Sequence, residues 1–421
     1  MIGNALFAFG IVLTTASQLR LPAVPLGVGE VCLVLWLALA SLRLVVSGRI
    51  CNPRAMLQII AFWACFAFAL SVGTCLAFLQ RELDLDSMLH DAFAYLLMAA
   101  ITFLIAATMR ADGSLRQTEW FLLAFWNIAL ALQLAMGWGF ISLPSVDPWF
   151  WDRFRGWAEN PNQVALYCAV FTPLSLGLAL SARGFGRIAG SFSCLLSFFV
   201  GRLTKSDTFL VAMVTAFALF LVLRIRTWLT SSEHRSGLRF AVAVFVVIAA
   251  VPLSLSLAPY ILATADDVES LAISLTKDRG GEGTQRTASL RLQLWQDALH
   301  RGLESGSLGL GPGPHLEKPN VVNHRALPAP FEAHSTLLDT FTQGGLLAVI
   351  AVCGLLAGIF ILALRAKLDA QAALMAALAI FSISHFVLRH PIVWFALAVG
   401  LILGSSRQPS PHASESEPCA G

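Results

Sequence analysis

Long apolar runs separated by short polar connections are the dominant pattern along this chain of 421 residues. A helix needs about 20 mostly apolar residues to cross a bilayer, and only a helix or a closed barrel can satisfy its backbone there. The pattern therefore predicts an all-α polytopic membrane protein with about twelve transmembrane helices. The predicted spans are 3–19, 26–46, 55–79, 92–109, 119–142, 164–182, 188–203, 208–223, 240–262, 343–364, 371–388 and 391–405.

The charges of the connections predict the orientation. Cytoplasmic connections collect Lys and Arg. With the N-terminus in the cytoplasm, every connection on that side is basic, whereas the opposite connection "QRELDLDSMLHD" is acidic. Both termini are then expected in the cytoplasm. The cytoplasmic basic residues are Arg49, Arg54, Arg110, Arg116, Arg183, Arg187, Arg224, Arg226, Arg235, Arg239, Arg365 and Lys367.

One long loop interrupts the regular spacing of the spans. The same parity places it on the outer side, and its basic residues do not contradict this because long loops escape the charge rule. The first run lacks a basic start and a small-residue cleavage site, which predicts a retained span. The expected organisation is spans one to nine over 1–263, the outer loop with short helices over 264–333, spans ten to twelve over 334–405, and a disordered cytoplasmic tail over 406–421.

Composition supports the bilayer as the main partner. Only 13% of residues are charged, against about 25% in soluble proteins. A formal net charge of +3 is too small to favour nucleic acid. The eight cysteines show no spacing typical of a metal site or a disulfide framework, so we expect no metal and no cofactor.

The stretch "RFRGWAENPNQ", residues 153–163, is unusually polar and lies on the predicted outer side. One interpretation is an interfacial anchor, with tryptophans at headgroup level and arginines on lipid phosphates. The other is an anion site, because the forks of Arg153 and Arg155 match phosphate geometry. Gly156 follows, and Asn160 or Asn162 would cap the next helix, whose first N–H groups also favour anions.

Three further stretches on that side carry candidate chemistry. In "SLRLQLWQDALHRG", Arg291 and Trp295 adjoin an apolar stripe, typical of a helix lying on the membrane or of a ligand-facing helix. In "GRLTKSDTF", Arg202 and Lys205 either snorkel to the interface or add positive charge. The glycines of "GSLGLGPGPH", residues 306–315, either form turns or allow close backbone approach to a ligand.

A histidine precedes the tenth span. His334, with Asp339 beyond it, could accept a proton from a hydroxyl nucleophile, or it could be structural at the membrane boundary. Glu30 is the only clear carboxylate inside a span, whereas an ion-coupled transporter is expected to need such groups. Positive charge together with a base favours transfer from a diphosphate leaving group. A twelve-span transporter or flippase and a non-catalytic scaffold are the alternatives.

The order of these motifs resembles the O-antigen ligase and polysaccharide polymerase superfamily. The residues that carry the resemblance are R-x-x-G-x-x-x-N-P-N from Arg153 to Asn162, R-x-x-x-W-x-x-A-L from Arg291, G-x-G-x-G from Gly309, then His334 and a Gly-Gly-Leu sequence at 344–346. Twelve spans with a large outer loop before the third-last also resemble that family.

The resemblance implies a glycosyltransferase at the periplasmic face of the bacterial inner membrane. The donor would be a glycan on undecaprenyl diphosphate, with no metal or nucleotide sugar at that step. The acceptor would be another glycan, for a polymerase, or the lipid A core, for a ligase. By position, Arg153 and Arg291 would hold the diphosphate, and His334 would deprotonate the acceptor hydroxyl with inversion at the anomeric carbon.

Two positions depart from the family pattern. Ser335 stands where an Asn often follows the histidine, and Asp207 stands where an Arg is often found. Lys205 or Arg202 could replace that missing charge. The sequence "LTKSDT" resembles exopolysaccharide members, which favours a polymerase for an exported or surface polysaccharide. A chain-length regulator would then be a further partner.

Overall fold

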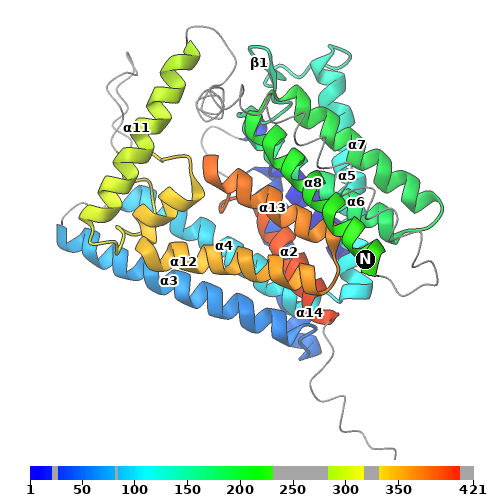
Figure 1. Cartoon of the computed structure of the whole chain (residues 1–421), viewed down its shortest axis with the longest axis horizontal. Helices are drawn as coiled ribbons and strands as arrows, with labels where there is room; N and C mark the ends of the chain where they lie inside the picture. The colour runs from blue at the N-terminus through cyan, green and yellow to red at the C-terminus, as the bar shows by residue number, and fades with distance from the viewer. Residues whose placement is uncertain (21–26, 81–83, 231–282, 317–330, 408–421) are drawn as a thin grey trace, which may run out of the picture.

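The computed structural model describes residues 1–20, 27–80, 84–230, 283–316 and 331–407. The predicted ninth span, 240–262, lies outside the described residues, as do parts of the outer loop and nearly all of the tail. Helices dominate what is described, so the predicted class, a nearly all-α polytopic membrane protein, is confirmed (Figure 1). Within the described part of the outer loop, the chain forms one helix, as expected.

Eleven of the twelve predicted spans coincide with helices. Among the described residues, seven helices are long and apolar enough to cross a membrane, and three apolar helices are shorter. The helices are α1 (Ile2–Leu13), α2 (Val28–Ser47), α3 (Pro53–Gln80), α4 (Leu85–Thr108), α5 (Arg116–Gly137), α6 (Pro161–Ser181), α7 (Phe185–Leu203), α8 (Asp207–Thr230), α11 (Gly283–Glu304), α12 (Thr336–Arg365), α13 (Asp369–Ser384) and α14 (Pro391–Ser406), with a 3₁₀ turn η1 (Ser17–Leu19) and a π turn η2 (Ala111–Leu115).

Burial separates central helices from peripheral ones. In α6 the most apolar window is 78% buried, whereas the corresponding window of α12 is 22% buried. Nearly every residue of α14 is buried as well. The apolar side chains left exposed on α2, α3, α8 and α12 are the surface expected to face lipid, because lipid tails solvate apolar side chains favourably.

A short hairpin precedes α6. Its strands are β1 (Trp149–Phe150) and β2 (Arg153–Phe154), paired antiparallel with Phe150 opposite Arg153. The turn contains Trp151 at φ 60°, with 87% of its surface exposed. An apolar pattern read only for helices does not predict this hairpin, because each strand has just two residues.

The tryptophans around the hairpin divide into two roles. The indole N–H of Trp149 donates to the Gly137 carbonyl at 2.8 Å, and that of Trp157 donates to Thr15 Oγ1 at 2.7 Å. These two rings therefore fasten the loop to α5 and to the end of α1. Only Trp151, of the three, has the exposure that an interfacial anchor requires.

Helix α12 is broken near its start. Gly345 has φ 63° and ψ −162°, outside the helical region. The N–H of Leu346 donates to the Ser307 carbonyl at 2.9 Å, and the N–H of Gly311 donates to the Gln343 carbonyl at 2.7 Å. The glycine-rich loop thus supplies the hydrogen bonds that the break releases.

The same loop packs on α3. A Cβ atom at Gly73 would lie 2.5 Å from the Gly311 nitrogen, and one at Gly311 would lie 2.6 Å from Thr74 Oγ1. Close backbone approach is therefore what these glycines provide, but the described partners are two helices of the chain itself. The expectation that the approach serves a ligand is corrected for Gly309 and Gly311, since backbone of α3 and α12 fills the space.

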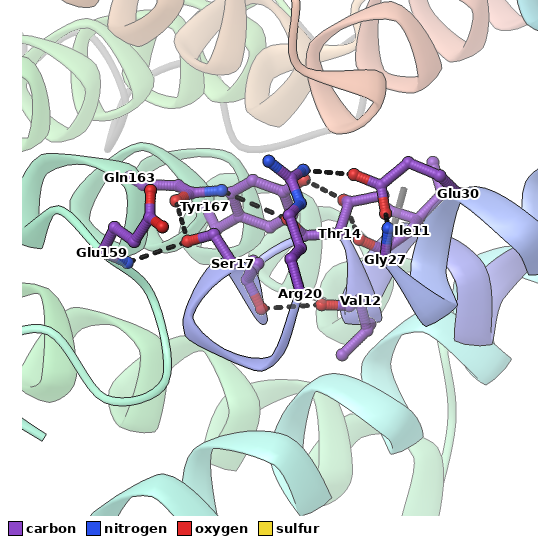
Figure 2. Close-up of polar contacts among 11 residues, drawn as sticks. Ile11, Val12, Thr14, Ser17, Arg20, Gly27, Glu30, Glu159, Gln163 and Tyr167 are labelled. Atoms are coloured by element: carbon purple, nitrogen blue, oxygen red, sulfur yellow. Dashed lines mark hydrogen bonds and ion pairs between the residues drawn. The ribbon is translucent and has the colours of Figure 1, made fainter. Parts of the chain in front are cut away.

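Polar contacts join the end of α1 to the start of α6, as Figure 2 shows. Thr14 Oγ1 and the Tyr167 hydroxyl lie 2.6 Å apart, and both side chains are buried. The backbone N–H of Glu159 donates to Ser17 Oγ at 2.8 Å. The loop before α6 is therefore held by the turn that follows α1.

Glu30 lies at a helix end. It occupies the first turn of α2, accepts from the Gly27 N–H at 3.0 Å and pairs with Arg20 (Figure 2). A carboxylate in that position stabilises the helix N-terminus. The carboxylate that the sequence singled out for an ion-coupled transporter is thus a capping residue, while Asp91 of α4 and Glu119 of α5 are buried in helices and paired with arginines.

Candidate functional site

Every second connection between consecutive helices lies at the same end of the bundle, and contacts between these connections show it. Arg389 pairs with Asp91, Lys205 with Asp152, and the backbone N–H of Thr336 donates to the His385 carbonyl at 3.2 Å. This is the end at which the sequence places its candidate chemistry. At the other end, Arg116 contacts Ser181.

Arg153 is the most enclosed arginine of the predicted set, with 9% of its surface exposed. Its Nε donates to the Thr204 carbonyl at 3.0 Å, and Nη2 donates to Asn162 Oδ1 at 2.8 Å. Thr204 is the C-cap of α7 and Asn162 lies in the first turn of α6. Both acceptors are neutral, so these two hydrogen bonds orient the guanidinium without neutralising it.

The Asn-Pro-Asn turn builds the start of α6. Asn160 is the N-cap, and its Oδ1 accepts from the Asn162 N–H at 2.8 Å. Pro161 occupies the first turn, where its missing N–H costs no hydrogen bond. The cap fixes Asn162, and Asn162 in turn fixes Arg153, so the motif is one structural unit.

Gly156 has a packing role within this unit. It has φ 56°, and a Cβ there would overlap the Gln133 side chain of α5. Glycine is therefore required both by the backbone conformation and by the close approach to α5.

Arg155 is engaged within its own loop. Nη2 pairs with Asp147 Oδ2 at 2.8 Å, Nε donates to the Asp147 carbonyl at 2.9 Å, and the guanidinium lies 5.3 Å from the Phe150 ring centre. These contacts fit an anchoring role. Its participation in donor binding stays a prediction.

Lys205 and Arg202 are neighbours in sequence of Thr204, whose carbonyl accepts a hydrogen bond from Arg153. Lys205 Nζ pairs with Asp152 Oδ2 at 2.6 Å, and its backbone has φ 50°. Arg202 lies in the last turn of α7 and is exposed. Lys205 therefore reaches the hairpin turn beside Arg153, and whether either residue replaces the missing charge stays a prediction.

His334 is held through its backbone by Asp339. Asp339 Oδ1 accepts from the Ala333 N–H at 2.7 Å, and Oδ2 accepts from the Ser335 N–H at 3.0 Å. His334 itself has φ 54°, a conformation rare outside glycine. The carboxylate is buried, whereas the imidazole is exposed. The arrangement therefore presents the ring on a fixed support.

Helix α11 is fastened to the same segment. The Trp295 indole donates to the Ala333 carbonyl at 3.1 Å, and Leu294 and Ala298 pack with Leu316 in a small apolar cluster. Arg291 lies one turn before Trp295 and is half-buried. The amphipathic helix predicted here thus packs on protein through its apolar stripe.

The pKa of His334 is lowered by its surroundings. Partial burial is the largest cause, the charges of Arg291 and Arg389 act in the same direction, and Glu332 opposes them. His334 is exposed to solvent, and of the charges that act on it Glu332 favours the imidazolium while Arg291 and Arg389 disfavour it. A neutral imidazole at neutral pH is the form that can accept a proton.

Arg153 and Arg291, which are far apart in the sequence, both affect the pKa of His385 at this end of the bundle. His385, just beyond α13, has a pKa well below its usual value, first because of burial and then because of Arg291, His334 and Arg153. Charges influence a pKa strongly only at short range. Arg153, Arg291 and His334 therefore each lie within electrostatic range of His385, although the sequence separates them widely.

Sequence reasoning missed Arg389, which bridges two carboxylates. Its Nη1 lies 2.5 Å from Glu332 Oε1, its Nη2 pairs with Asp91, and its guanidinium lies 4.9 Å from the Phe386 ring centre. The available signal was an Arg-His pair in the short connection between the last two spans. Among the described residues, no group of three or more His, Cys, Asp or Glu is placed to hold a metal ion.

Residues 192–353 match the family described as O-antigen ligase. The matched segment contains Lys205, Arg291, His334 and Asp339, whereas Arg153 precedes it. No curated protein matches the chain. The resemblance to the O-antigen ligase and polymerase superfamily is thereby confirmed over that segment, and the match supports an enzyme of this group. Together with the apolar helices, it also supports a membrane protein.

Proposed function

We propose that this chain, whose residues 192–353 carry the O-antigen ligase pattern, is an inverting glycosyltransferase of the bacterial inner membrane. It transfers a glycan from undecaprenyl diphosphate to an acceptor hydroxyl at the periplasmic face. The observations that carry the proposal are that Arg153 is enclosed and oriented by Asn162 and the Thr204 carbonyl, and that Trp295, one turn after Arg291, hydrogen-bonds the residue before His334. Two permanent charges and a base at one end of the bundle suit a diphosphate leaving group.

The arginines stabilise the charge that develops on the diphosphate as the bond to the anomeric carbon breaks. Arg153 is already oriented by Asn162 and the Thr204 carbonyl, so little reorganisation is needed when donor binds. Because the guanidiniums supply the positive charge, the proposed step requires no metal. Lys205 is our candidate for the charge that replaces the family arginine absent at Asp207.

His334 acts as the base. The acceptor oxygen forms a bond to the anomeric carbon on the face opposite the diphosphate, its proton passes to the imidazole, and the lipid diphosphate departs. Inversion follows because there is one displacement. Glu332, whose charge favours the imidazolium of His334, stabilises the base once it has taken the proton.

The acceptor distinguishes a polymerase from a ligase. We favour a polymerase that extends a surface polysaccharide or exopolysaccharide, with a chain-length regulator as its partner. The alternative is an O-antigen ligase that delivers the glycan to the lipid A core. A transporter or flippase is the alternative of another class, and the position of Glu30 at a helix end, paired with Arg20, weighs against it.

Reconstitution tests the proposal. The full chain, purified into liposomes with an undecaprenyl-diphosphate-linked oligosaccharide and EDTA, is expected to yield longer lipid-linked glycans and free undecaprenyl diphosphate. Product formed only when lipid A core is supplied would assign a ligase. Movement of donor across the bilayer without any new glycosidic bond would contradict an enzyme and support a flippase.

A further inference from the structure

Helix α6 connects the candidate site to a second feature at the opposite end of the bundle. It starts at Pro161, beside Arg153, and ends at Ser181. Its 21 residues span roughly 30 Å at about 1.5 Å per residue, which is close to the thickness of a bilayer's hydrocarbon core. The Ser181 end therefore lies near the other membrane boundary.

A cavity of about 370 Å³ opens at that end, a volume within the usual range of small-molecule pockets. Its apolar lining includes Pro173, Leu174 and Leu178 of α6 and Leu403 of α14. The remaining lining comes from η2, the start of α5, the end of α8, the connection between α12 and α13, the start of α13 and the residue that follows α14; Figure 1 shows α8 beside α13. A lining that is part apolar and part charged suits an amphiphile.

Four cations line the cavity, contributed by four different segments. They are balanced in part by three carboxylates, which leaves a net charge of +1 (4 − 3). Two of the acids already have partners: Glu119 lies 3.7 Å from Arg116, and Asp369 hydrogen-bonds Thr227 near the charge of Arg224. The cations are Arg116, Arg224, Lys367 and Arg407, and the acids are Asp112, Glu119 and Asp369.

With those two acids paired, Lys367, Arg407 and Asp112 remain and give the formal excess of one positive charge. Lys367 and Arg407 are both exposed side chains, and within the described residues neither is recorded in an ion pair. They belong to the α12–α13 connection and to the residue that follows α14, so a single anion between them would tie these two segments together. Arginine and lysine near a headgroup plane bind phosphate oxygens readily.

We propose that this cavity binds a phosphodiester monoanion, supplied as the headgroup of an anionic lipid in the leaflet opposite the candidate active site. One negative charge matches the excess of one positive charge, and the acyl region lies along the Leu174 and Leu403 wall. The bound lipid stabilises the contacts among α8, α13 and α14. The inference rests on the cavity and its charges, and it is independent of the proposed reaction.

Thermal unfolding of the purified full chain in a neutral detergent tests the proposal. Short-chain phosphatidylglycerol is expected to raise the unfolding temperature, while phosphatidylcholine of the same chain length is not. The double variant Lys367→Gln/Arg407→Gln should need about tenfold more phosphatidylglycerol for the same effect, since two charge-assisted contacts are lost. Arg183→Gln, an exposed change on the same side outside the lining, is the matched control.

Other results would overturn the proposal. Equal stabilisation of the wild type and the double variant would show that phosphatidylglycerol acts elsewhere. Stabilisation by inorganic phosphate alone, lost in the double variant, would assign the cavity to a free phosphate and reject the lipid. No response of the wild type to either additive would remove the site. Native mass spectrometry of the untreated protein, showing retained phosphatidylglycerol that the double variant loses, would independently support it.

Discussion

The two carboxylate oxygens of Asp339 accept hydrogen bonds from the backbone on either side of His334, at 2.7 Å from the Ala333 nitrogen and 3.0 Å from the Ser335 nitrogen. The histidine between these two amides has φ 54°. The contact explains how a non-glycine residue keeps that conformation, which costs about 1–3 kcal/mol, because two hydrogen bonds hold the backbone on either side of it. Asp339 is thus a positioning residue for His334.

Asp339→Asn should therefore lower kcat far more than it raises the KM for donor. An amide has one acceptor oxygen, so one backbone N–H loses its partner and His334 loses its fixed presentation. We expect a fall in kcat of about 10- to 100-fold, the scale seen when a positioning contact is lost. Asp297→Asn, on the exposed face of α11, is the control. A proportional rise in KM with unchanged kcat would contradict the assignment.

Arg291→Lys is expected to abolish transfer while leaving insertion and folding intact. An ammonium group keeps the charge but cannot provide the planar fork that binds two diphosphate oxygens. Glycan product from the reconstituted enzyme is the readout. Arg301→Lys, later on the same helix, should retain activity. Unchanged polymer output from Arg291→Lys would refute the diphosphate role.

The pH profile should report His334. The pKa of His334 is lowered from its usual value, so the neutral base predominates at neutral pH and decreases as pH falls through the lowered pKa, which gives activity an acid limb. Glu332→Gln removes a charge that raises this pKa, so the acid limb of kcat/KM should move to lower pH. Glu304→Gln, at the exposed end of α11, should leave the limb in place. A shift toward higher pH would contradict the arrangement.

His334→Ala should remove the acid limb of the pH profile and most of the turnover, while a donor analogue still binds. Because Arg153 and Arg291 are untouched, the affinity for the diphosphate should stay within a few-fold of wild type. Binding can be measured directly with the labelled lipid diphosphate. Wild-type activity in this variant would retire His334 as the base.

Gly73 lies where the backbone of α3 meets the glycine-rich loop and α12, so any side chain at this position should be destabilising. Gly73→Ala places a Cβ 2.5 Å from the Gly311 nitrogen and 2.6 Å from the Gln343 oxygen, so α3 must move away from the broken helix. We expect destabilisation of about 1–3 kcal/mol, as for other overpacked sites. Gly354→Ala, in the long part of α12 with no atom within 4 Å, should be neutral or slightly stabilising. Denaturant titration in detergent measures both.

Local sequence patterns were sufficient to predict the positions of the described helices, the Asn160 cap of α6 and the proximity of Asp339 to His334. The apolar runs predicted the helices because a spanning helix needs continuous apolar length, and the Asn-Pro-Asn turn marked the start of α6. The Asn160 cap follows from residue type. Asp339 was identified near His334, but the two amide contacts could not be foreseen, since they depend on the turn between residues 333 and 335.

Long-range partners were beyond the sequence pattern. Arg389, Asp91 and Glu332 come from three separate segments, and nothing in any one segment indicates the others. Arg153 and Arg155 lie two residues apart and carry the same charge, yet one is enclosed by Asn162 and the Thr204 carbonyl, and the other pairs with Asp147. The β1–β2 hairpin gives the two arginines their different surroundings. Its strands have two residues each, too few to show an alternating hydrophobic pattern in the sequence.

The break at Gly345 divides α12 into two mechanically separate pieces. The short piece carries Asp339, and its end is anchored through Gln343 to the loop at Gly311, while Leu346, at the start of the long piece, bonds to Ser307. Because the helix is not continuous at Gly345, the piece that carries Asp339 takes its position from the glycine-rich loop as well as from the rest of α12. The placement of His334 therefore depends on residues 307 and 311, which precede it in the chain.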